Sequence, residues 1–198
     1  MSNKSKEIDE FQTYHKVYLS RTRFATYRES GETIIERFFQ INGFNIIYPE
    51  TLSFFQQILI YKDAEIIASI EGTIAHNILF SVNAKSQIII KKQELENSRQ
   101  PWFNEMKKVP VKVINCYYEP IPGLPYSWDE GPFLILFNGN IKRFARENGM
   151  ILPKGIVKAN IKAILHYLHI ALLHFLQRHS LLQKAIDPLF ILARKLRR

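Results

Sequence analysis

The feature that most constrains this chain is a regular alternation of short apolar runs with stretches in which apolar residues recur at helical spacing. The strand-like segments, whose centres are mostly apolar, lie at residues 15–20, 44–47, 64–70, 86–90 and 109–116. Strands that alternate with helices at short intervals are typical of a parallel sheet covered by helices on both faces. The sequence therefore predicts an α/β fold with a Rossmann-like sheet.

Helical spacing predicts the segments that connect these strands. In the first, apolar residues recur from Ile34 to Ile41, and Asn42-Gly43 ends the helix. Thr51 is a suitable N-cap for the second helix. The further helices are expected at residues 52–61, from Gly72-Thr73 through Phe80, at 94–107 and around 135–147.

Three segments divide the 198 residues, a length that suits one domain with an appendage. Residues 1–13 are polar and are expected to form a flexible N-terminus, without the apolar stretch of a secretory signal. Residues 14–153 form the Rossmann-like domain, which ends in an irregular Pro/Gly-rich stretch and a last helix. Residues 154–198 form a basic, amphipathic helical tail.

The positive charge of the chain is concentrated in that tail. Nine basic residues and one acidic residue from Lys154 to Arg198 give +8 of the net +9. The main domain is close to neutral, which argues against nucleic acid as its partner. The single cysteine, Cys116, excludes an intrachain disulfide and agrees with a reducing, cytoplasmic compartment.

An apolar stripe runs along the tail. Its residues recur at steps of three and four and are Ile161, Ile164, Leu165, Leu168, Leu172, Phe175 and Leu176. The longest run without Lys, Arg, Asp or Glu, residues 163–177, is too short for a comfortable membrane span. We expect helices that lie on an anionic membrane surface, here the inner face of the plasma membrane.

Polar residues follow the predicted strands at the places where parallel sheets bind ligands. Arg21 and Arg23 come directly after the first strand, where a guanidinium can form parallel hydrogen bonds with a phosphate. The alternative is a pair of solvated loop arginines. Glu50 follows the second strand, where a carboxylate can accept both hydroxyls of a ribose; the alternative is an acid favoured by the helix dipole.

The Gly72-Thr73 turn follows the third and most apolar strand. Gly72 allows close approach of a ligand to the backbone, and the next helix offers unpaired N–H groups to an anion. His76 and Asn77 lie one helical turn further on. The alternative is an ordinary strand-to-helix turn with a capping threonine.

Neither the tail histidines nor Cys116 indicates a metal or cofactor site. The histidines, which are His166, His169, His174 and His179, point in scattered directions on a helix and have no carboxylate beside them. Cys116 has no base near it in sequence and is expected to be an inert core thiol.

Taken in order, the strand-end motifs resemble the C-terminal half of glycosyltransferase family 61. The matching segments are residues 17–21 (VYLSR), 43–50 (GFNIIYPE), 52–57 (LSFFQQ), 64–68 (AEIIA) and 71–80 (EGTIAHNILF). The resemblance covers about residues 14–92, and its glycine turn is closer to that of the family's bacterial polysaccharide enzymes. Many relatives have His-Gly-Ala-Gly at this turn.

This resemblance implies one half of a GT-B fold and an inverting, metal-independent sugar transfer from a nucleotide-sugar, with no cofactor. Arg21 would face the donor diphosphate, the Gly72-Thr73 turn would supply backbone donors, and Glu50 would contact the nucleoside. His76 and Asn77 would lie nearby, His76 being the first choice for a catalytic base.

The resemblance also implies a glycan or lipid-linked acceptor, as in capsule and other polysaccharide biosynthesis. Family members usually carry a preceding domain, whereas about 14 residues precede the first strand here. We therefore expect a truncated chain, or a partner chain that supplies the N-terminal GT-B domain. The alternatives are a catalytically degenerate nucleotide-sugar-binding module and a membrane-associated interaction module.

Overall fold

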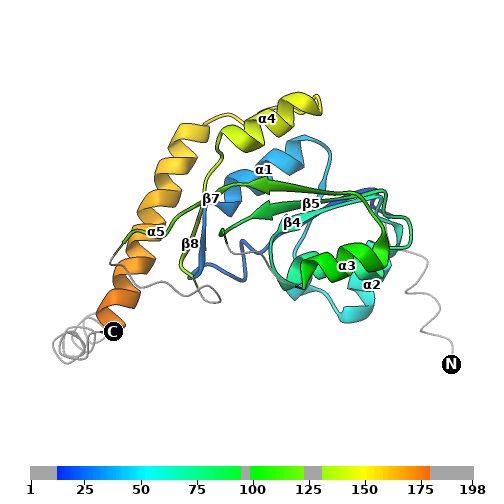
Figure 1. Cartoon of the computed structure of the whole chain (residues 1–198), viewed down its shortest axis with the longest axis horizontal. Coiled ribbons are helices and arrows are strands. Elements are labelled where there is room, and N and C mark those ends of the chain that lie inside the picture. Colours follow the sequence, from blue (N-terminus) through cyan, green and yellow to red (C-terminus); the bar gives the residue numbers. More distant parts are fainter. Residues whose placement is uncertain (1–12, 95–98, 123–130, 179–198) are drawn as a thin grey trace, which may run out of the picture.

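In a computed structural model of the chain, which describes residues 13–94, 99–122 and 131–178, five parallel strands form the main sheet (Figure 1). The strands are β1 (Lys16–Leu19), β3 (Asn45–Ile47), β4 (Ile66–Ile70), β5 (Ser86–Lys91) and β6 (Val111–Asn115). Their order is β3-β1-β4-β5-β6. The chain therefore winds from β1 in one direction to β3 and then in the other direction from β4 onward. This places the topological switch point between β1 and β4, where doubly wound sheets bind their ligands.

Helices cover both faces of this sheet, which confirms the predicted α/β, Rossmann-like fold. On one face α1 (Glu32–Ile41) and α4 (Gly139–Glu147) bury Phe38, Phe39 and Phe144 against Tyr18 and the neighbouring strands. On the other face lie α2 (Phe54–Asp63) and the 3₁₀ helix η2 (Thr73–Phe80), against which α3 (Gln100–Lys107) packs.

A second, three-stranded sheet extends the domain beyond the main one. It has the order β2-β8-β7, with β2 (Glu29–Ser30) parallel to β8 (Phe133–Ile135) and β7 (Tyr117–Tyr118) antiparallel to it. The chain must come very close to β8 at Gly31, where a Cβ atom would lie 1.8 Å from the carbonyl oxygen of Ile135. Gly31 has a φ of 101° and begins α1, so a residue with a side chain could not occupy this position without displacing β8.

Several predicted boundaries are wrong, each for a local reason. Thr51 ends the short 3₁₀ helix η1 (Pro49–Thr51), and the N-cap of α2 is Ser53, whose side chain and that of Gln56 form a reciprocal capping box. Ile135 belongs to β8, because α4 begins only after Asn138. The side chain of Asn138 accepts hydrogen bonds from the first backbone N–H groups of that helix.

Helix α5 (Ile156–Arg178) forms most of the described part of the tail. It packs on the small sheet through Ala163 and Tyr167, which lie against Leu134 and Leu136. The apolar stripe predicted from spacing is a different face. Five of its members are exposed, namely Ile161, Ile164, Leu165, Leu168 and Leu172.

By length and composition, residues 156–176 of α5 could cross a membrane, although 22% of the window is buried within the protein. The prediction that the tail is too short to span rests on residues 163–177 alone, because Lys158 and Lys162 interrupt the longer window. The expected flexible N-terminus lies almost wholly outside the described residues, as do His179 and the basic C-terminal end.

Candidate functional site

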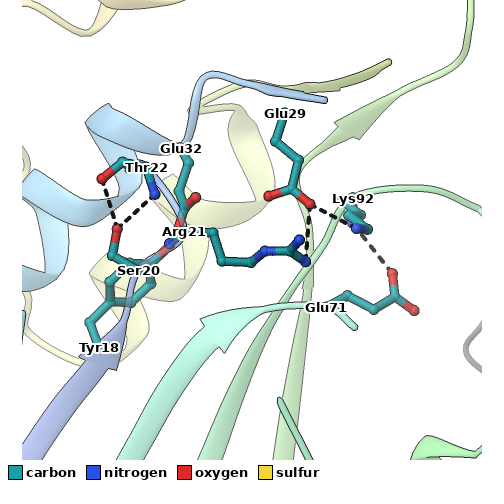
Figure 2. Close-up of polar contacts among 8 residues, drawn as sticks. All are labelled: Tyr18, Ser20, Arg21, Thr22, Glu29, Glu32, Glu71 and Lys92. Carbon is teal, nitrogen blue, oxygen red and sulfur yellow. Dashed lines mark hydrogen bonds and ion pairs between the residues drawn. The ribbon is translucent and has the colours of Figure 1, made fainter. Parts of the chain in front are cut away.

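The carboxyl ends of three neighbouring strands bring together Arg21, Gly72 and Lys92. Figure 2 shows the side chains of Arg21 and Lys92. Arg21 and Gly72 follow β1 and β4, so they lie at the switch point of the sheet, and Lys92 follows the next strand, β5. Gly72 adopts a φ of 129°, and a Cβ atom there would lie 3.6 Å from Nη1 of Arg21 and 3.9 Å from Nζ of Lys92. Two cations therefore flank a strand-end backbone that carries no side chain.

Glu29 of β2 joins the two cations. Its Oε1 lies 3.3 Å from Nη1 of Arg21 and 2.8 Å from Nζ of Lys92, as Figure 2 shows. The Lys92 ammonium also lies 4.3 Å from the ring centroid of Phe133 on β8. Burial lowers the pKa of Lys92 below its ordinary value, while Glu29 acts in the opposite direction. The small sheet thus supplies the groups that stabilise a buried lysine.

Two further carboxyl groups border the cluster. Glu71 is buried, and its Oε2 accepts a hydrogen bond of 3.4 Å from the backbone N–H of Lys92. Glu32, at the start of α1, accepts hydrogen bonds at Oε1 from the hydroxyl of Tyr18 (2.9 Å) and from the backbone N–H of Arg21 (3.0 Å). Burial, with the nearby Glu29, raises the pKa of Glu32 to about 8, so its carboxyl is largely protonated at neutral pH.

Arg23, the second predicted arginine, lies apart from Arg21. Its guanidinium carbon stacks 3.7 Å from the ring centroid of Tyr48, which follows β3. The Tyr48 hydroxyl in turn donates to Glu36 of α1 at 3.2 Å, and Glu36 also accepts from Ser20 and Thr22. The two arginines therefore contact different residues at the same edge of the sheet, Arg21 with Glu29 and Arg23 with Tyr48.

The remaining predicted residues lie along this edge without joining the Arg21 cluster. The ring of His76 packs 4.0 Å, centroid to centroid, from Phe103 of α3. Asn77 donates to the Tyr61 hydroxyl at 3.5 Å, and Thr73 and Glu50 are exposed. Burial, with a smaller contribution from Arg99, lowers the pKa of His76, so the imidazole is neutral at pH 7.

The described residues contain no group of three or more His, Cys, Asp or Glu side chains placed to hold a metal ion. Cys116 is buried, and burial raises the pKa of its thiol to about 12. The prediction of an unreactive core thiol is confirmed.

Sequence reasoning missed Glu29, Glu32 and Lys92. The sequence does contain an indication of Lys92, because this residue follows a predicted strand just as Arg21 does. It contains no such indication of Glu29, because the place of Glu29 depends on the parallel pairing of β2 with β8, about a hundred residues further along the chain.

Residues 2–89 match the family model described as Glycosyltransferase 61. The match confirms the resemblance to this family, and it supports a glycosyltransferase that takes a sugar donor and a glycan acceptor. It includes Arg21, Glu29 and Gly72 and ends before Lys92. No curated protein and no solved structure matches the chain.

The raised pKa of Glu32 predicts a pH-dependent stability. An acid whose pKa is higher in the folded than in the unfolded protein stabilises the fold fully below the ordinary value of 4.5, and this contribution is lost as the pH rises through about 8. Glu32→Gln keeps the acceptor for Tyr18 and Arg21 but cannot ionise. As the pH rises from about 4.5 to about 8, we expect the wild type to lose stability relative to this variant. The difference between their free energies of unfolding should change by roughly 1.4 kcal/mol per pH unit.

Urea denaturation at several pH values measures this difference. Glu105→Gln, at an exposed position on α3, controls for the loss of one carboxyl group. A wild type and a Glu32→Gln variant with parallel pH profiles would contradict a carboxyl that is protonated in the folded protein.

Proposed function

We propose that this chain is the donor-binding half of a glycosyltransferase that transfers a sugar from a nucleotide-sugar to a glycan acceptor. The observation that carries the proposal is that Arg21 and Gly72 meet at the switch point between β1 and β4, with Lys92 beside them at the end of β5. A diphosphate placed there would meet two cations and the backbone N–H groups at the start of η2. All of these stabilise negative charge.

This arrangement suits a reaction in which negative charge develops on a leaving diphosphate. In an inverting, metal-independent transfer, Arg21 and Lys92 supply the positive charge, and the exposed Thr73 donates its hydroxyl. Glu50, exposed after β3, accepts the hydroxyls of the ribose. A neutral His76 can take the proton of the attacking acceptor hydroxyl.

The acceptor side requires a second domain in this proposal. GT-B chemistry takes place between two facing Rossmann-like domains, and the described residues form one such sheet with a small sheet beside it. The other domain belongs to the same protein or to a partner chain. Its acceptor would be a glycan or a lipid-linked sugar of a bacterial surface polysaccharide, such as a capsule.

A specific observation favours a second candidate, a nucleotide-sugar-binding module without turnover. Glu29 already neutralises charge on both Arg21 and Lys92. A diphosphate must compete with this carboxylate, which would weaken donor binding. Sugar transfer by the complete protein would separate the two candidates, since the binding module gives none.

We also propose attachment to the cytoplasmic face of the plasma membrane through α5. The exposed apolar face of this helix includes Ile161, Leu165 and Leu172, and Lys158 is exposed on the same helix. Because α5 packs on β2 and β8 through its opposite side, it can lie in the interface without leaving the domain. This suits an acceptor carried on a membrane lipid.

The donor proposal predicts nucleotide binding that depends on Arg21. Calorimetry with UDP, GDP and CMP compounds should give at least one binder. Arg21→Ala should weaken it by roughly 1.5–3 kcal/mol, the range for a hydrogen bond to a charged group. Arg143→Ala, at an exposed position of α4, should leave the affinity unchanged. Well-folded protein that binds none of these compounds would exclude the donor-binding role.

The membrane proposal predicts flotation with liposomes that contain anionic lipid, reduced by high salt and by Leu165→Glu. Ile151→Glu is the matched control, because Ile151 is similarly exposed (66% against 62%) but lies before α5. Equal recovery on neutral liposomes at high salt would rule out the electrostatic part. Resistance to carbonate extraction would indicate a spanning helix instead.

A further inference from the structure

A pocket of about 330 Å³ lies beside the Arg21 cluster, between the segment that follows β1, the start of α1 and the middle of α5. Arg21 and Glu29 are part of its lining, so it adjoins the proposed diphosphate site. Ala25, Ala159 and Ala163 also line it, and these small side chains leave room for a ligand.

Two buried carboxyl groups in the pocket wall each have an oxygen without a hydrogen-bond partner among the described residues. They are Oε2 of Glu29 and Oε2 of Glu32, two residues that are 6% and 3% exposed as a whole. In Figure 2 the free oxygen of Glu29 lies on the side that faces Glu32. Buried polar atoms are nearly always paired, so these two oxygens indicate a ligand or water that pairs with them.

The protonation of Glu32 determines which of these two oxygens can donate a hydrogen bond and which can accept one. Its Oε1 already accepts two hydrogen bonds, from Tyr18 and Arg21, so its proton is placed on Oε2. The pocket wall therefore offers a donor at Glu32 and an acceptor at Glu29. A hydroxyl group, which both donates and accepts, is complementary to this pair.

Exposed cations stand at the mouth of the pocket. Arg37 of α1 and Lys162 of α5 both line it, and both are exposed. His166 is beside them, and its Nδ1 shares a hydrogen bond of 2.9 Å with the Ser30 hydroxyl. The mouth thus favours a negatively charged group, while the interior favours hydroxyls.

We propose that this pocket binds an acidic sugar, whose hydroxyls reach Glu29 and Glu32 and whose carboxylate lies between Arg37 and Lys162. The inference rests on the proposed function and deepens it, because a sugar seated beside the donor diphosphate is placed as the acceptor. It assigns part of the acceptor site to the same domain that binds the donor.

The test is binding of free acidic sugars to the full chain, followed by NMR chemical shifts. Glucuronate, galacturonate and N-acetylneuraminate are the probes, with glucose as the neutral counterpart. A ligand of this size binds with a Kd of about 1 mM or weaker. At least one acidic sugar should shift the resonances of pocket residues, and glucose should bind about fivefold more weakly or worse.

Lys162→Ala should weaken that binding by about fivefold, the scale of one exposed charge interaction. Lys158→Ala is the matched control, because it is exposed one turn earlier on α5 but does not line the pocket, and it should have no effect.

Three outcomes would overturn the inference. The first is that no acidic sugar shifts the resonances of the pocket residues. The second is that Lys162→Ala and Lys158→Ala lose equal affinity for the sugar. The third is that a saturating nucleoside diphosphate displaces the sugar. Displacement would assign the pocket to the donor. Nucleotide binding that depends on Arg21 without acidic-sugar binding would refute the pocket inference alone and leave the proposed function standing.

Discussion

The ion cluster of Arg21, Glu29 and Lys92 is the interaction on which the rest of this structure depends. Its side chains are 14%, 1% and 7% exposed, and charges removed from water to this extent are costly unless they are paired. Arg21 follows β1, Glu29 belongs to β2 and Lys92 follows β5. The ion pairs therefore require these three strands to be in place. The cluster therefore connects the small sheet to the edge of the main sheet where the parallel strands end.

The same geometry links the tail to the site. Glu29 belongs to β2, which pairs with β8, and α5 packs on that small sheet. The close approach of Gly31 to Ile135 leaves no space for a side chain between α1 and β8. A helix that meets the membrane would thus be connected, through one small sheet, to the residues proposed to hold the donor. This arrangement would place a lipid-linked acceptor near the reacting edge.

Local pattern was sufficient to predict the parallel sheet, because short segments rich in apolar and β-branched residues alternate with helical spacing and end in turns that contain polar residues. It also placed Arg21 and Gly72 each directly after a strand, and the structure brings them together because the carboxyl ends of parallel strands share one edge. It could not find Glu29, whose position depends on long-range pairing. Spacing alone could not show the packed face of α5, because Ala163 and Tyr167 are less hydrophobic than the exposed leucines of the predicted stripe.

The central claim is that a donor diphosphate binds at the switch point between β1 and β4. A crystal structure of the protein with a bound nucleoside diphosphate tests it most directly. The account predicts phosphate oxygens within hydrogen-bond distance of the Arg21 guanidinium and of the backbone N–H groups at Gly72-Thr73, with Arg21 drawn away from Glu29. A diphosphate bound elsewhere, with the contacts of Arg21 and Lys92 to Glu29 unchanged, would contradict it.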